Sequence, residues 1–193
     1  MAHYVTNLYQ YPDPTYTLAD GRVATITSLY TSNRQTPDGM RDCAEGVIDG
    51  KKYTIRTDNK PGLVAMLAAE IARREADLLA KVPGIHLLLA ARAARSDYHE
   101  AMQDMMDDES GVRPPKAPAV SAEAVAAQYP EAVAYLRIIA YADADSASNV
   151  GYNRRRAADA GIEALNSGST PTEAKKIMDA AFEAAEKNST YND

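Results

Sequence analysis

The residues with the clearest chemical potential are carboxylates in the middle of the chain. Side chains three and four residues apart lie on one side of an α-helix. Five carboxylates have this spacing: Asp97, Glu100, Asp104, Asp107 and Asp108. Three methionines, Met102, Met105 and Met106, fall on the other side of the same predicted helix. The stripe is either a solvated helix face opposite a buried methionine face, or an acidic surface that binds a basic protein groove.

Metal binding is a weaker interpretation of these carboxylates. They would have to converge with His86 or His99, and these two histidines lack the spacing of a helical zinc motif. Residues 143–149, DADSASN, resemble the start of a calcium loop. However, Ser148 stands where that loop needs glycine, and Arg154 stands where it needs glutamate. We therefore expect no metal ion and no cofactor.

Nucleophilic catalysis finds little support in the sequence. The single cysteine, Cys43, lies in a predicted strand, and none of the three histidines is close to it in sequence. A buried small residue is the better interpretation of this position. The phosphate-binding loop, the nucleophile elbow and the dinucleotide fingerprint are all missing. We expect a protein that is not an enzyme, although distant residues could still assemble an active site.

Two further segments are candidate binding surfaces. Arg154, Arg155 and Arg156 form the only run of three basic residues. A helix would direct them apart, and nearby acids dilute their charge, so nucleic-acid binding is the alternative here rather than the first interpretation. Tyr9 and Tyr11 belong to the segment LYQYPDPTY. Tyrosine is common at interfaces, so this segment either binds a partner or lies as an arm on the sheet.

Composition narrows the class of protein. The chain has 193 residues, a net charge of -6, twelve tyrosines, one phenylalanine and no tryptophan. A general nucleic-acid binder would usually be basic. We find no apolar run of membrane length and no signal-peptide pattern, and we expect a cytoplasmic protein. Its alanine-rich helices could also pair with a second copy of the chain.

The first third of the chain predicts a small antiparallel sheet. Residues 22–31 alternate and are rich in β-branched side chains, residues 32–39 read as a loop, and Asp49-Gly50 predicts a tight hairpin. Tyr53 and Ile55 should face the core. Tyr4, Val5, Leu8 and Tyr9 could form a short strand, after which Pro12 and Pro14 prevent regular pairing. The prediction is about three strands covered by the first long helix.

Helices fill the rest of the chain. The first should start near Pro61 and end at Pro83-Gly84, with its apolar face interrupted at Arg74 and Glu75; the second should continue to Glu109. Four shorter helices should follow Ser121, Pro130, residue 151 and the capping box of Thr170 and Glu173. The predicted fold is α+β: residues 1–109 form the sheet with two long helices, residues 110–120 a Pro-rich linker, and residues 121–193 an all-α domain.

The second long helix and the residues after it resemble a helical region of small accessory proteins of phages and mobile elements. The shared features are Tyr98, Met102, Met105 and Met106 on the acidic helix, Pro114-Pro115 in the linker, and Tyr129-Pro130 at a helix start. The resemblance covers the C-terminal half and carries over no functional residues. It implies expression in a bacterial host and, for many such proteins, inhibition of a host factor, as in anti-CRISPR and other anti-defence proteins.

Three functional hypotheses follow. The first is a non-enzymatic inhibitor that binds a host protein or ribonucleoprotein complex through the acidic stripe or through Tyr9 and Tyr11. The second is a nucleic-acid-binding accessory protein that uses Arg154, Arg155 and Arg156. The third is an enzyme with a site built from distant residues. A phage structural component remains a further alternative.

Overall fold

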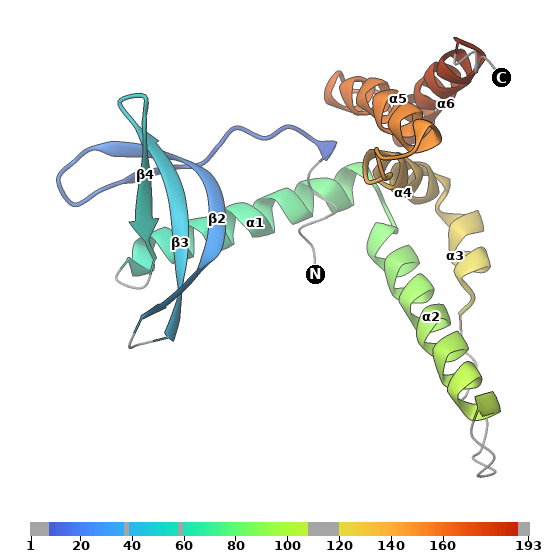
Figure 1. Ribbon diagram of the computed structural model, residues 1–193, viewed down its shortest axis with the longest axis horizontal. Helices are drawn as coiled ribbons and strands as arrows, with labels where there is room; N and C mark the ends of the chain where they lie inside the picture. Colours follow the sequence, from blue (N-terminus) through green and yellow to red (C-terminus); the bar gives the residue numbers. More distant parts are fainter. Residues whose placement is uncertain (1–7, 37–38, 58–59, 108–119, 189–193) are drawn as a thin grey trace. The chain divides into compact units, whose positions relative to one another are not determined.

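The computed structural model describes residues 8–36, 39–57, 60–107 and 120–188. It confirms the α+β prediction, because an antiparallel sheet precedes six helices (Figure 1). The sheet has four strands rather than the three predicted. Contacts divide the chain into two compact units. The sheet unit is Gln10–Ala76, and the helical unit comprises Leu8, Tyr9 and the described residues from Asp77 onward.

The strands follow one another in the sheet in chain order, all antiparallel: β1 (Thr15–Thr17), β2 (Val23–Thr36), β3 (Gly39–Ile48) and β4 (Lys51–Arg56). The strand missed by sequence reasoning is β1. Pro14 does not prevent it, because the Pro14 carbonyl accepts a hydrogen bond from the Ile26 amide at 2.8 Å. The predicted loop at 32–39 was also wrong. Most of it extends β2 and β3, which pair as far as Thr36 and Gly39.

The hairpin at Asp49-Gly50 is confirmed, since both residues have positive φ, of 51° and 75°. Both central residues of a type I′ turn need this conformation. Ile55 is buried as predicted, but Tyr53 is 41% exposed, so its predicted place in the core was wrong. The reason is local: Tyr53 lies on an edge strand, and its cross-strand partner is Gly46, which has no side chain to cover the ring.

The core of the sheet unit forms between one face of the sheet and α1 (Pro61–Lys81), whose first turns the strands cross in Figure 1. The buried side chains are Ala24, Ile26, Ala44, Ile48, Ile55, Leu63 and Leu67. Farther along α1, Leu78 is buried in the helical unit, as is Val82 directly after the helix. The helix therefore supplies apolar side chains to both units. The division between the units falls just after Arg74 and Glu75, where the apolar face is interrupted.

The helical unit contains α2 (Ile85–Asp107), α3 (Ala122–Gln128), α4 (Pro130–Ala142), α5 (Asn149–Asn166) and α6 (Pro171–Asn188). In contrast to the predicted grouping, α2 lies in this unit and not with the sheet. The predicted linker at 110–120 lies outside the described residues except for Val120, so it stays a prediction. None of the described helices is long and apolar enough to cross a membrane.

Predicted helix starts are confirmed where a side chain caps the helix. Ser121 accepts a hydrogen bond from the Ala124 amide at 3.1 Å. In the capping box, the Glu173 amide donates to Thr170 at 3.3 Å, and the Thr170 amide donates to the Glu173 carboxylate at 3.0 Å. These caps satisfy backbone donors that a helix N-terminus otherwise leaves unpaired. Together they fix where α3 and α6 begin.

Candidate functional site

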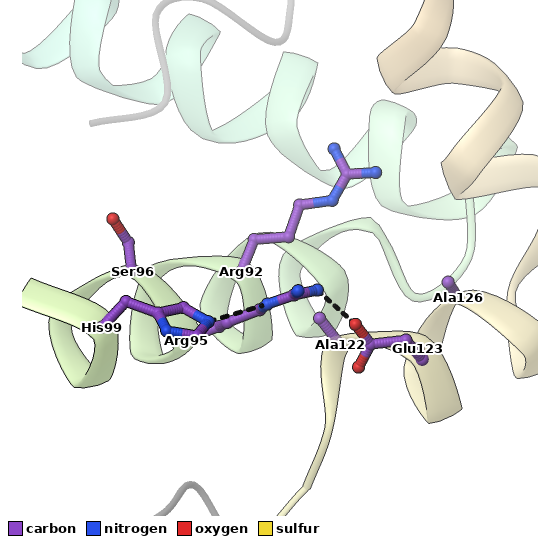
Figure 2. A pocket seen from close by; sticks show the side chains of 7 residues that line it. All are labelled: Arg92, Arg95, Ser96, His99, Ala122, Glu123 and Ala126. Carbon is purple, nitrogen blue, oxygen red and sulfur yellow. Dashed lines mark hydrogen bonds and ion pairs between the residues drawn. The ribbon is translucent and has the colours of Figure 1, made fainter. Parts of the chain in front are cut away.

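An open pocket of about 350 Å³ lies between α2 and α3 (Figure 2). Its lining residues are Arg92, Arg95, Ser96, His99, Ala122, Glu123 and Ala126. Four of them follow one another on α2 at the spacing of a single helix side. The Ser121 cap fixes the first turn of α3, and this turn places Glu123 opposite α2. The pocket is thus built from one side of a long helix and the start of a short one.

Arg95 is the centre of the polar contacts in this pocket. Its guanidinium forms an ion pair with the Glu123 carboxylate, and its Nε donates to His99 Nε2 at 3.4 Å. The pKa of the Glu123 carboxyl is held below its usual range by the Glu123 backbone N–H and by the charge of Arg95. Because both partners are more than half exposed, this ion pair adds little stability. Its main effect is to orient Arg95 along the pocket.

Arg92 differs from Arg95 in its surroundings. Figure 2 shows its side chain directed away from Arg95, His99 and Glu123. Within the described part of the chain, Arg92 has no ion pair or hydrogen bond. Ser96 and His99 line the same pocket, but no hydrogen bond joins them, whereas a nucleophile and its base need one. The Arg92 guanidinium is therefore the group in this pocket that is available to an anion.

The acidic stripe lies on the neighbouring face of α2. Asp97 and Glu100 are exposed, and neither makes an ion pair or hydrogen bond with any described residue. Asp104 and Asp107 belong to α2 by their backbone, and Asp108 lies outside the described residues. On α1 and α6, some carboxylates are instead paired with cations three or four residues away, as in Glu70 with Arg73 and Asp179 with Lys175. Asp97 and Glu100 thus face solvent without a cation partner among the described residues.

Tyr9 does not belong to an exposed binding segment. It is 7% exposed, and its ring stacks on Tyr135 of α4 with centroids 5.7 Å apart. Burial raises the pKa of the Tyr9 hydroxyl to about 12, and the charge of Asp77 adds to this effect. Lys81 lies 4.5 Å above the Tyr9 ring, and Asn166 donates to the Leu8 carbonyl at 3.0 Å. A ring so enclosed offers little surface to a partner, and the partner-binding role of Tyr9 stays a prediction.

Tyr11 lies on the sheet unit, where it contacts α1. The guanidinium carbons of Arg73 and Arg74 are 5.4 and 5.0 Å from its ring centroid. Arg74 also donates to the Pro12 carbonyl at 3.2 Å. These contacts hold the segment after Tyr9 against α1. They favour the interpretation of an arm, whose end also joins the sheet as β1.

The three consecutive arginines of α5 have different environments. All are exposed. Arg154 lies 5.6 Å from the Tyr141 ring centroid, and Arg156 lies 5.9 Å from that of Tyr152. The α-helix directs neighbouring side chains about 100° apart, so the run does not form one continuous surface.

Cys43, the residue considered as a nucleophile, is buried as predicted, with 6% exposure.

The pocket itself was not predicted from the sequence. Arg92, Ser96 and His99 share a helix side, which a helical projection of residues 85–107 could have shown. The pairing of Arg95 with Glu123 joins residues 28 positions apart, across the predicted linker. No local sequence pattern predicts a contact between residues so far apart in the chain. In the described part of the chain, no group of three or more potential metal ligands comes together.

No protein-family model, curated protein or solved structure matches this chain. The comparisons therefore supply no relative from which a fold or function could be transferred. The function proposed for the α2 surface rests on the geometry and charge of its own residues.

Proposed function

We propose that this chain is a non-enzymatic binding protein whose acidic α2 face contacts a basic surface on a partner protein. The observation that carries the proposal is the exposure of Asp97 and Glu100 without any cation partner among the described residues. Exposed carboxylates without a cation partner among the described residues are available to a partner's lysines and arginines. Complementary charge of this kind speeds association and selects the partner.

The pocket beside the acidic face supports a defined orientation of the complex. Arg92 adds an uncompensated positive charge to the same helix that carries Asp97 and Glu100. A partner would have to match both signs of charge, in the right order along the helix. Mixed charge patterns reject partners that carry only one sign, because like charges then meet across the interface.

The resemblance to phage accessory proteins suggests the class of partner. We propose a host factor with a basic groove, such as a nucleic-acid-guided defence complex, which the acidic face would occupy in place of nucleic acid. The net charge of -6 supports this choice, because long-range attraction to a basic groove needs an acidic protein. Inhibition would then follow from occupying the groove rather than from a reaction.

The test compares two double charge reversals in pull-downs from a bacterial lysate. Asp97→Lys with Glu100→Lys should weaken capture of the partner at least about tenfold, because attraction becomes repulsion. The matched control is Asp159→Lys with Glu163→Lys on α5, which changes net charge equally at exposed positions. The control should retain the partner.

Two results would contradict the proposal. One is equal capture by the wild type and by the Asp97/Glu100 variant. The other is an equal loss in both variants, which would show a net-charge effect only. Nuclease treatment of the lysate distinguishes protein binding from the alternative, nucleic-acid binding. Captured proteins that are lost after nuclease treatment would indicate binding through nucleic acid.

A further inference from the structure

Two arginines from different helices converge on one tyrosine in the helical unit. Arg137 of α4 and Arg154 of α5 have their guanidinium carbons 4.6 and 5.6 Å from the Tyr141 ring centroid. Phe182 of α6 meets the same ring edge-on, with centroids 5.4 Å apart. Tyr141 is only 6% exposed, whereas both arginines are exposed. The buried ring thus contacts two exposed arginine side chains at the surface.

The charge of this cluster is not compensated. Neither Arg137 nor Arg154 forms an ion pair with a described residue, unlike Arg22, Arg73 and Arg95. The aromatic face attracts each guanidinium without neutralising its charge. A bound anion would neutralise that charge through charge-assisted hydrogen bonds.

The donors of the cluster indicate which anion. Arg137 Nη2 donates to the Tyr141 hydroxyl oxygen at 3.2 Å, and the Tyr141 proton has no acceptor among the described residues. Two guanidinium forks and one O–H group offer more donors than the two oxygens of a carboxylate can accept. Free phosphate and phosphate monoesters have at least three non-bridging acceptor oxygens, and they match the guanidinium fork.

We propose that Arg137, Arg154 and Tyr141 form a binding site for a phosphate group, separate from the acidic face of α2. The phosphate belongs to free phosphate or to a small phosphate monoester. A nucleic-acid backbone, whose phosphodiesters have only two non-bridging oxygens, is the other source that the experiment distinguishes. Arg155 and Arg156 are not part of the site, since neither contacts Tyr141.

The test is a titration of the full chain with inorganic phosphate, followed by calorimetry, at constant ionic strength. Arg137→Gln and Arg154→Gln should each weaken phosphate binding about tenfold, because each removes a charge-assisted hydrogen-bond donor. Tyr141→Phe should weaken it about fivefold or less, because it removes a neutral donor. Arg155→Gln is the matched control, with the same loss of charge at an exposed position on α5, and it should bind like the wild type.

A second titration with a short single-stranded oligonucleotide, followed by fluorescence anisotropy, identifies the source of the phosphate. Weaker oligonucleotide binding by Arg154→Gln but not by Arg155→Gln would place a nucleic-acid backbone in the site. The same difference seen only with inorganic phosphate would assign free phosphate or a small ester. The proposal is overturned if the wild type shows no saturable binding of either probe, or if Arg155→Gln weakens binding as much as Arg154→Gln.

Discussion

Gly84, at the break between α1 and α2, shows how much a single residue type matters. Its φ is +78°, in the left-handed region that favours glycine. A Cβ added there would lie 2.2 Å from the Tyr129 ring, far inside van der Waals contact. Glycine is therefore required twice at this position, once by the backbone and once by the packing of the residue that precedes α4.

Substitution of Gly84 by alanine should lower the free energy of unfolding by about 2 to 4 kcal/mol, from backbone strain together with displacement of Tyr129. Gly168→Ala is the matched control. Its φ is +95°, but nothing lies within 4 Å of the added Cβ, so only the strain of about 1 kcal/mol applies. Chemical denaturation of both variants measures the difference. Equal losses would show that Tyr129 moves aside without cost.

At the scale of elements, α1 is joined to the segment that precedes β1 by a network centred on Glu70. The Glu70 carboxylate accepts hydrogen bonds from Arg73 at 2.7 and 2.8 Å and from Arg74 at 2.7 Å. The same arginines contact Tyr11, and Arg74 donates to Pro12. Hydrogen bonding from Arg73, then from Arg74, lowers the pKa of Glu70 from 4.5 to about 2.

This network predicts a specific loss of stability in acid. Because the pKa of Glu70 is lower in the folded state, the ionised carboxylate contributes its full stability above pH 4.5 and loses it as the pH falls toward 2. Glu70→Gln should cost about 1 kcal/mol at pH 7 and less at low pH. Glu75→Gln, on the same helix, is the control. Melting temperatures of both variants from pH 7 to 2.5 provide the measurement, and a constant deficit for Glu70→Gln across that range would contradict the expectation.

Most element ends could be predicted because their causes are local. The Asp49-Gly50 turn, the Pro83-Gly84 break and the Thr170 capping box each depend on residues within a few positions of one another. The short strand β1 could not be predicted in this way, because three residues carry no period and depend on pairing with β2. The burial of Tyr9 depends on α4, and the hydrogen bond from Asn166 to Leu8 spans 158 residues. Contacts between residues so far apart cannot be predicted from local sequence patterns.

At the scale of the whole molecule, the interruption of the α1 apolar face lies close to the boundary between the two compact units. In the sequence, Arg74 and Glu75 only weaken an amphipathic pattern. In the structure, they precede the point where one compact unit gives way to the other. The candidate pocket crosses the predicted domain boundary for the same reason. The grouping of α2 with α3 is set by packing in the helical unit, and the position of the Pro-rich segment does not reveal it.

Two compact units should unfold in two separable transitions. Leu63 and Met178 are both fully buried, the first in the core of the sheet unit and the second in the helical unit. Leu63→Ala should shift one transition in differential scanning calorimetry, and Met178→Ala the other, each through a loss of about 2 to 5 kcal/mol. A single transition shifted by both substitutions would show that the units unfold together.

The position of the single cysteine has a practical consequence for such experiments. Cys43 is the only thiol in 193 residues, and it is buried in β3, an inner strand of the sheet. A thiol reacts only when a reagent can reach it. The rate of alkylation of the wild-type chain therefore reports how often the sheet unit opens, while openings confined to the helical unit leave no chemical mark. The chain carries its own reporter for one unit, at a single site and without engineering.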